Sequence, residues 1–177
     1  MYEIERKFLI QRLPEIVKQC EKDIIEQGYL SITPEVRIRT RYRDPSNPRY
    51  YKLSIKSDGG LKRKEIEIDL TKEQYEGIKS CLNAPMIIKE YYIIKLDDGH
   101  KLEIFVVDPG MKTSFIYAEI EFSTEDEAKL YKLPEWFVEE CEPIEVTGRA
   151  VYYMKNYWQL SRIIEKSSLE KVDGNNQ

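Results

Sequence analysis

Hydrophobic and polar residues alternate along several stretches of this chain. The alternating stretches are residues 1–10, 36–41, 53–56, 63–69, 101–107, 117–122 and 144–147. A period of two is typical of antiparallel β-strands that bury one face. Turn sequences rich in Gly, Pro, Asn and Asp lie between them, at residues 44–48, 57–60, 97–99 and 108–110. We therefore expect a mainly β fold in which antiparallel strands form a meander that is closed or nearly closed.

Helical patterns interrupt the expected strands. Two capping boxes, at residues 71–74 and 124–127, precede apolar residues at helical spacing. Pro134 begins a further helical turn, and residues 150–164 are typical of an aromatic-rich final helix. Residues 13–20 fit a short helix, whereas residues 23–31 fit either its continuation or a strand.

Composition and charge exclude several classes of protein. The 177-residue chain has 28 basic and 32 acidic side chains, for a formal net charge of −4, whereas a nucleic-acid binder is usually basic. No apolar run reaches the length of a membrane span, and charges from Glu3 onward argue against a signal peptide. Three distant cysteines and a single histidine, His100, argue against a disulfide framework, a zinc site and a His-based catalytic triad. We expect a cytoplasmic protein with reduced thiols, one domain over residues 1–165 and a disordered tail over residues 166–177.

Charged side chains are concentrated on one face of the expected strands, because residues two apart in a strand point the same way. The charged rows are Glu3, Glu5 and Lys7; Arg37, Arg39 and Arg41; Lys52 and Lys56; Arg63, Glu65 and Glu67; and Glu119 and Glu121. In one interpretation these rows face water, and the apolar residues between them form the core of a sandwich. In the other, eight strands close into a barrel with the charged rows inside. Carboxylates there would bind divalent cations, while arginines and lysines would bind an oligophosphate.

Several of these segments resemble, in order, the motifs of CYTH-domain proteins, the triphosphate tunnel metalloenzymes. The ExExK sequence of residues 3–7 resembles the N-terminal signature of that family. The other resembling segments are residues 26–30, 35–39, 53–56, 61–67, 118–122 and 145–148. The resemblance implies a closed eight-stranded antiparallel β-barrel with flanking helices, whose interior is a tunnel open at both ends. It also favours a strand over residues 23–31.

The resemblance further implies roles for individual residues. Glu3, Glu5 and Glu121 match metal-ligating positions for Mg²⁺ or Mn²⁺, with Glu119 beside them. The positions that match phosphate-binding residues are Lys7, Arg37, Arg39, Lys56, Arg63 and Lys89. The residues expected to act in catalysis are Glu3, Glu5, Lys7, Arg39 and Glu121. The residues expected in the tunnel wall are Lys52, Glu65, Glu67, Tyr91, Glu103, Phe105 and Arg149.

Three positions depart from the pattern of many family members. Tyr91 stands where many carry Arg, Phe105 where many carry an acidic residue, and Arg149 where many carry Asp. By alternation with Tyr92 and Ile104, the first two rings should point inward. They would either narrow the tunnel or contact an organic group of a substrate.

Together these features predict metal-dependent hydrolysis of a triphosphate, with water attacking the terminal phosphorus. Inorganic tripolyphosphate is the favoured substrate, because the positions that suit a bare triphosphate are kept and no base-recognition pattern is seen. Thiamine triphosphatase, class IV adenylate cyclase and a non-catalytic module that binds polyphosphate or nucleotide are the alternatives. The expected partner is a small-molecule triphosphate rather than a nucleic acid or a membrane, and the chain is expected to be a monomer or a homodimer.

Overall fold

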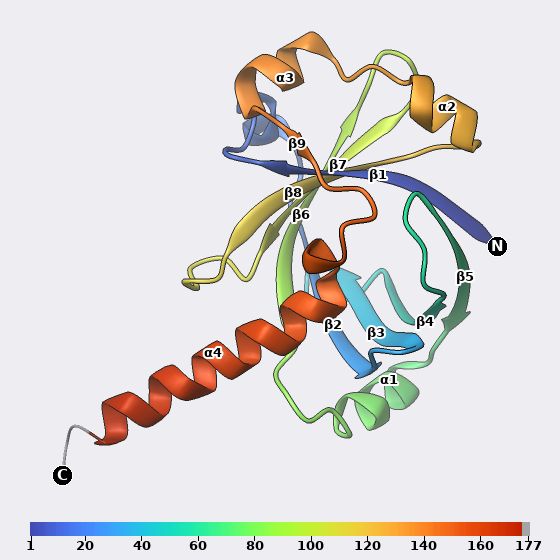
Figure 1. Cartoon of the computed structure of the whole chain (residues 1–177). Coiled ribbons are helices and arrows are strands. Elements are labelled where there is room, and N and C mark those ends of the chain that lie inside the picture. The colour runs from blue at the N-terminus through green and yellow to red at the C-terminus, as the bar shows by residue number, and fades with distance from the viewer. Residues whose placement is uncertain (175–177) are drawn as a thin grey trace.

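Eight antiparallel strands form a closed barrel in the computed structural model, which describes residues 1–174, with side chains as far as residue 164 (Figure 1). The strands are β1 (Tyr2–Ile10), β2 (Asp23–Ser31), β3 (Glu35–Tyr42), β4 (Tyr50–Lys56), β5 (Lys62–Asp69), β6 (Ile87–Lys95), β7 (Lys101–Val107) and β8 (Phe115–Glu121). They pair in the order β5–β4–β3–β2–β6–β7–β8–β1, and β1 pairs with β5 to close the ring. The predicted mainly β barrel is confirmed, and residues 23–31 form a strand.

Strand β1 closes the barrel by changing partners along its length. Residues 2–4 pair with β5, and residues 5–10 pair with β8. The short strand β9 (Ile144–Glu145) pairs with β1 at Phe8 and Leu9, beyond the residues that pair with β5. The register places Glu5 opposite Glu121. Because residues that lie opposite each other in an antiparallel ladder point to the same side of the sheet, β1 and β8 bring their charged rows together.

The larger apolar core lies outside the barrel. Ile104 and Ile120, on the outward faces of β7 and β8, are fully buried. They are covered by the 3-10 helix η1 (Glu15–Gln19) and by the helices α2 (Glu125–Leu130) and α3 (Glu135–Cys141), which adds the buried Phe137 (Figure 1). On the outward face of β5, by contrast, Ile66 and Ile68 are 47% and 49% exposed.

Both capping boxes begin helices, as predicted. At α1 (Lys72–Lys79), Thr71 accepts a hydrogen bond from the backbone N–H of Gln74, and the Gln74 side chain accepts one from the backbone N–H of Thr71. At α2, Thr124 accepts a hydrogen bond from the backbone N–H of Glu127. The segment expected to form a short helix over residues 13–20 contains only η1, which ends at Gln19, and the backbone of Cys20 is extended.

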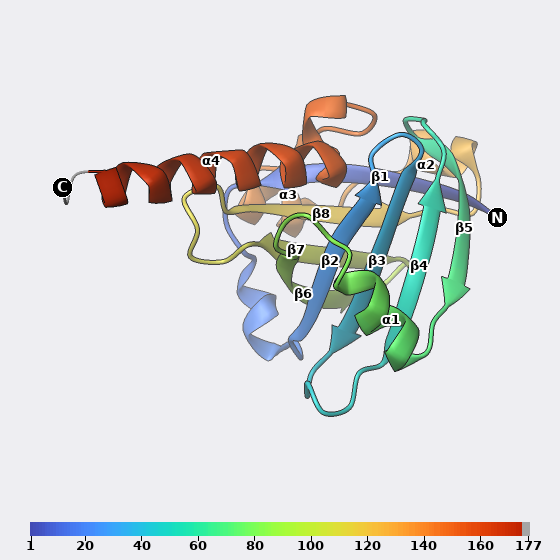
Figure 2. The same ribbon diagram turned by 90° about the horizontal axis from the view of Figure 1, so that it is seen from below.

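The final helix α4 (Met154–Gly174) follows a 3-10 turn, η2 (Ala150–Tyr152), and contacts loops at one end of the barrel before extending away from it (Figure 2). The buried Asp108 fixes its position by accepting hydrogen bonds from Tyr157 and Arg162, at 2.9 and 2.6 Å. None of the helices in the described residues is long and apolar enough to cross a membrane.

The helical backbone of α4 enters the segment 166–177, for which the sequence predicts disorder. It continues to Gly174, and residues 175–177 lie outside the described residues. Lys, Glu and Leu within residues 165–171 are good helix formers. The helical backbone fits this propensity, and disorder of the tail stays a prediction.

Strand β6, like β2, is an element of the barrel that alternation does not indicate. Its outward residues Tyr92 and Ile94 belong to the external core, while its inward residues Ile87 and Tyr91 pack inside the barrel. Both faces are therefore largely apolar or aromatic, and the period of two disappears. The enrichment in Ile and Tyr, followed by the turn at residues 97–99, is the signal that indicates such a strand.

Candidate functional site

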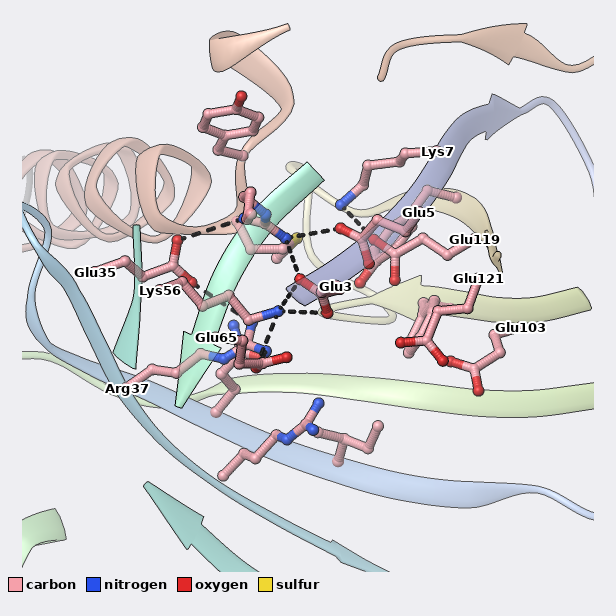
Figure 3. Close-up of a pocket in the computed structure, with 18 of the residues that line it drawn as sticks. Glu3, Glu5, Lys7, Glu35, Arg37, Lys56, Glu65, Glu103, Glu119 and Glu121 are labelled. Atoms are coloured by element: carbon pink, nitrogen blue, oxygen red, sulfur yellow. Dashed lines mark hydrogen bonds and ion pairs between the residues drawn. The ribbon is translucent and has the colours of Figure 1, made fainter. Parts of the chain in front are cut away.

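The barrel encloses a cavity of about 360 Å³ with a highly charged wall (Figure 3). The acidic residues that line it are Glu3, Glu5, Glu35, Glu65, Glu67, Glu103, Glu119 and Glu121. The basic residues that line it are Lys7, Arg37, Arg39, Arg41, Lys56, Arg63 and Lys89. These residues occupy alternate positions on the strands, so the charged rows face the inside of the barrel. The alternative of a sandwich with solvated charged rows is wrong.

Two residues predicted for the tunnel wall do not line this cavity. Lys52 is partly buried and reaches only the rim, where its Nζ lies 2.6 Å from Glu67 Oε2. Arg149 is exposed and begins η2. The chain turns at Gly148, whose φ of 72° favours glycine, and this turn ends the inward alternation before Arg149. All the other predicted site residues line the cavity.

An ion-pair cluster joins β1 to β4 and β5. Lys56 Nζ lies 2.7 and 2.6 Å from the two carboxylate oxygens of Glu3. Arg63 Nη2 donates hydrogen bonds to both Glu3, at 3.0 Å, and Glu5, at 2.7 Å. Lys56 also lies 3.2 Å from Glu65. Glu3 is therefore held by two cations, whereas Glu5 shares one of them.

This unequal pairing appears in the pKa values of the two carboxyl groups. Burial alone would raise the pKa of Glu3, but the charges of Lys56 and Arg63 outweigh it and lower the pKa to about 2. Burial and then the charges of Glu119 and Glu3 raise the pKa of Glu5 to about 7. The cavity thus contains more negative charge around Glu5 than its cations offset.

Further carboxylates extend the acidic group along β7 and β8 (Figure 3). Glu119 lies 3.0 Å from Lys7 Nζ. Burial and the charge of Glu3 raise the pKa of Glu121. Burial also raises the pKa of Glu103, against the hydrogen bond that it accepts from Tyr91. Repulsion among these groups favours the binding of a cation.

The carboxylates of Glu3, Glu5, Glu119 and Glu121 are the groups in the cavity wall that could hold a divalent cation. They lie on the neighbouring strands β1 and β8, and carboxylate oxygens are ligands that Mg²⁺ and Mn²⁺ prefer. Within the described residues, however, no three acidic, histidine or cysteine side chains already have the arrangement of a metal site. Arg63 and Lys7 hold carboxylate oxygens that a cation would need.

The arginines of β3 supply hydrogen-bond donors that lack acceptors. Arg37 is 8% exposed, and its guanidinium lies 3.6 Å from Glu35 and 3.9 Å from Glu65, beyond good hydrogen-bond distance. The Nε atoms of Arg37 and Arg39 are buried and have no hydrogen-bond partner. Buried charged donors without acceptors are costly, so this part of the wall is suited to an anion.

Lys89 also lacks an acidic partner among the described residues. Its buried Nζ donates to the hydroxyl of Tyr117, at 2.9 Å, and to Oε1 of Gln27, at 3.2 Å. Burial and then the positive charges of Arg37 and Lys7 lower the pKa of Lys89 well below its ordinary value. An anion bound nearby would favour its protonated form.

Aromatic rings form the wall of the cavity on β6, β7 and β8. Phe105 stacks on Tyr117 with ring centroids 4.6 Å apart, and Tyr91 lies 4.9 Å from Phe105. Lys7 Nζ is 3.9 Å from the centre of the Tyr117 ring, and the Arg41 guanidinium is 4.4 Å from that of Tyr91. These distances are typical of cation–π contacts. Tyr91 and Phe105 therefore point inward, as alternation predicts.

Sequence reasoning named Arg41 only as part of a basic row and gave no role to three other residues of the wall. Arg41, Glu35, Tyr117 and Gln27 all line the cavity. Arg41, Glu35 and Tyr117 each lie two residues from a predicted site residue on the same strand. Continuing the alternation along those strands would therefore have placed all three in the wall. Gln27 is not indicated by charge, and only its place in β2 identifies it.

Comparison with known proteins finds relatives of similar length. The chain is 36% identical over 140 residues to the inorganic triphosphatase of Nitrosomonas europaea, and the match covers 79% of this chain and 89% of that protein. The crystal structure of the inorganic triphosphatase NE1496 matches with a TM-score of 0.57 and 28% identity, over 88% of this chain and 93% of that one. Comparison with protein-family models gives no match.

A second solved structure shares the fold. It is HpAC1 from Hippeastrum, described as an adenylyl cyclase candidate with a dominant triphosphatase activity. The TM-score is 0.54 and the identity 13%, over 88% of this chain and 95% of that one. At this identity the likeness concerns the barrel alone.

Proposed function

The chain belongs to the family of the Nitrosomonas europaea inorganic triphosphatase, and we propose that it hydrolyses a linear triphosphate, with inorganic tripolyphosphate preferred. The products are pyrophosphate and phosphate. The proposal includes a requirement for Mg²⁺ or Mn²⁺, as in the triphosphate tunnel metalloenzymes that the sequence motifs resemble. It extends the activity of the Nitrosomonas europaea relative to this chain because the cavity has the matching chemistry.

One observation supports this function above the others. Inside a closed barrel, Arg37 and Arg39 present buried Nε donors without acceptors, and Lys89 has only neutral partners. Guanidinium groups bind phosphate oxygens through charge-assisted hydrogen bonds, which are short and strong. A triphosphate offers several such oxygens in a line, and would satisfy donors on more than one strand at once.

The basic residues bind and orient the substrate. Arg37 and Arg39, on β3, hold non-bridging oxygens of the phosphates. Lys7 on β1 and Lys89 on β6 approach the phosphates from other parts of the wall. Their positive charge favours the negative charge that develops on the departing pyrophosphate as the bond to the terminal phosphorus breaks. The barrel wall limits access of bulk water, which strengthens these interactions.

The acidic residues hold the metal and a water molecule. Glu3, Glu5, Glu119 and Glu121 are the proposed ligands for Mg²⁺ or Mn²⁺, which when bound neutralises phosphate charge and lowers the pKa of a coordinated water. Water attacks the terminal phosphorus in line with the bond to the leaving pyrophosphate. No covalent intermediate with the protein is needed, consistent with the chain having a single histidine and scattered cysteines.

The aromatic wall supports inorganic over organic triphosphates. Phe105 stacks on Tyr117, Tyr91 lies tilted against Phe105, and the three rings fill the interior on one side of the cavity. The Phe105 ring offers no hydrogen bond to phosphate, and contacts among the three rings leave them engaged rather than open to a nucleobase. A tripolyphosphate needs no further room, whereas ATP or thiamine triphosphate must also place an organic group.

A substrate panel tests the proposal. Phosphate release is measured for tripolyphosphate, pyrophosphate, ATP and thiamine triphosphate, each with Mg²⁺, with Mn²⁺ and with excess EDTA, and cyclic AMP is measured with ATP. We expect metal-dependent release from tripolyphosphate, with an efficiency more than about ten times that for either organic triphosphate, or about 1.4 kcal/mol of discrimination.

Other results would contradict parts of the proposal. Full activity in EDTA would remove the metal requirement. Efficiency that is higher for ATP or thiamine triphosphate would overturn the preference for tripolyphosphate. Binding of tripolyphosphate without phosphate release would indicate a binding module in place of an enzyme.

A further inference from the structure

Arg63 lies between the two carboxylates of β1 that are proposed to bind metal. Its Nη2 is 3.0 Å from Glu3 Oε2 and 2.7 Å from Glu5 Oε1. Among the described residues it is the one cation that contacts both groups, because Lys56 reaches Glu3 and Glu65 but not Glu5. We propose that Arg63 is an internal counter-cation that occupies the metal position in the free protein and moves to the triphosphate when metal binds.

Metal and guanidinium compete for the same oxygens. Arg63 Nη2 donates hydrogen bonds to Glu3 Oε2 and Glu5 Oε1, so a cation that bridges these two oxygens would occupy the space where the guanidinium lies. Two cations cannot share that space without repulsion. An arginine remains charged at all ordinary pH values, so the competition cannot be relieved by loss of a proton. The guanidinium must therefore leave when the metal arrives.

The surroundings offer the released side chain two kinds of partner. Arg63 Nη1 already lies 3.9 Å from Glu35 Oε2, and the guanidinium carbon is 5.9 Å from the centre of the Tyr153 ring. Both Glu35 and Tyr153 also line the cavity, and Figure 3 shows Glu35 on the side away from Glu103 and Glu121. A bound triphosphate adds acceptors that are more strongly charged than either. Arg63 can then bind phosphate without leaving the cavity.

Positive coupling between the two ligands follows from this exchange, given the triphosphate and metal sites proposed above. Metal alone must break two ion pairs and leave a buried guanidinium poorly paired. Triphosphate alone must draw Arg63 away from Glu3 and Glu5 and leave those carboxylates repelling each other. When both bind, each supplies the partner that the other displaces. By linkage, each ligand must raise the affinity of the other by the same factor.

The test measures Mn²⁺ binding by calorimetry, with electron paramagnetic resonance of the free ion as a second readout. The purified full chain is titrated with and without an imido analogue of tripolyphosphate, whose P–N–P bridges resist hydrolysis. In the wild type we expect the analogue to tighten Mn²⁺ binding about tenfold, within the usual range of coupling between sites. In Arg63→Gln we expect Mn²⁺ alone to bind about tenfold more tightly than to the wild type, with little further effect of the analogue.

Two matched variants separate this mechanism from a general change of charge. Lys62→Gln removes a positive charge from the neighbouring residue of β5, which points outward and pairs with Glu125. Arg39→Gln removes a positive charge inside the cavity, at a residue that pairs with Glu67. Both should keep the coupling between Mn²⁺ and the analogue, although Arg39→Gln weakens analogue binding. If Arg63→Gln does not fold, Arg63→Lys is used, and its single ammonium should give a smaller gain in Mn²⁺ affinity.

The outcomes distinguish this inference from the proposed function. Unchanged or weaker Mn²⁺ binding in Arg63→Gln, or in Arg63→Lys where that variant is used, would overturn the role of Arg63, even if the wild type hydrolyses tripolyphosphate. Absence of Mn²⁺ binding in every variant, with hydrolysis persisting in EDTA, would instead overturn the metal site itself. Tighter Mn²⁺ binding with lost coupling in the Arg63 variant alone would support the exchange.

Discussion

The two sides of the barrel use the alternation of their strands in opposite ways. On β3, β4 and β5 the inward face is charged, while outward burial varies from Ile38 on β3, which is fully buried, to Ile66 and Ile68 on β5, which are about half exposed. On β6, β7 and β8 the outward face is the main core, while inward residues include Phe105 and Tyr117. The strands alone do not decide which face is buried. Coverage by η1, α2 and α3 makes the outside of one half apolar and dry.

The two inner walls also hold their cations differently. On the charged side, ion pairs fix the basic groups, as between Lys56 and Glu3. On the aromatic side, ring faces and neutral oxygens hold Lys89, while Lys7 lies over the Tyr117 ring and also pairs with Glu119. A cation on a ring face keeps more of its charge available to an anion than one already paired with a carboxylate. The aromatic wall therefore contributes to phosphate binding indirectly.

The largest expected effect concerns the carboxylates of the charged side. Glu5→Gln removes a proposed metal ligand while conserving size, and should lower the rate of tripolyphosphate hydrolysis about 10³-fold, or about 4 kcal/mol. Glu139→Gln, at an exposed position on α3, should retain the wild-type rate. Phosphate release with saturating Mg²⁺ is the measurement. A Glu5→Gln rate close to that of the wild type would remove Glu5 from the catalytic machinery.

The next effect compares the outer faces of the two sides. Ile104→Ala removes a fully buried side chain from the external core and should lower the free energy of unfolding by about 3 kcal/mol. Ile68→Ala, on the half-exposed face of β5, should lower it by less than about 1 kcal/mol. Urea denaturation gives both values. Similar losses at the two positions would mean that the outside of β5 is covered in solution.

A smaller effect should come from the aromatic wall. Phe105→Ala opens space beside the cavity, and should lower the ratio of catalytic efficiencies for tripolyphosphate and ATP about tenfold. Val106→Ala alters the adjacent residue, which packs on the external core, and should leave the ratio unchanged. If both variants keep the wild-type ratio, the ring does not determine specificity.

The smallest effect is on stability and depends on pH. The pKa of Glu5 is about 7 in the folded chain and 4.5 ordinarily, so between these values the folded state binds more protons than the unfolded state. The free energy of unfolding therefore falls as pH rises through this window. Without divalent metal, Glu5→Gln should melt about 3 °C above the wild type at pH 8, for a gain of about 1 kcal/mol.

Near pH 4.5 the same comparison should give little difference, because Glu5 is then protonated in the folded state. Glu139→Gln again provides the control, with no pH-dependent gain. A wild type that is more stable than Glu5→Gln at pH 8 would show that ion pairing with Arg63 outweighs the burial and repulsion of the carboxylate.

Much of the fold and of the candidate site could be predicted from local patterns. Alternation identified the strands with one charged face, and residues such as Glu3 and Arg37 entered the site through it. Alternation does not determine whether the charged face of a strand lies in water or inside the barrel, because this depends on which distant segments cover the other face. The family resemblance supplied the choice, and the closed barrel confirms it.

Other features depend on long-range pairing or on single residues. Arg63 meets Glu3 and Glu5 only because β5 pairs with β1 across about 60 residues of chain. Strand β6 lacks alternation because both of its faces are covered. Arg149 leaves the wall because one glycine turns the chain. Of these outcomes, the contact of Arg63 with Glu3 and Glu5 has no local sequence signal.

The most direct test of a charged interior that binds triphosphate is the melting temperature with and without the imido analogue and Mg²⁺. At a concentration one hundred times the dissociation constant, the ligand should stabilise the wild type by about 2.7 kcal/mol, which raises the melting temperature by about 5–10 °C. Arg39→Ala should lose most of this shift, whereas Arg12→Ala, which alters an exposed pair with Glu142, should keep it. An equal shift in all three proteins would contradict the placement of the β3 arginines at the binding site.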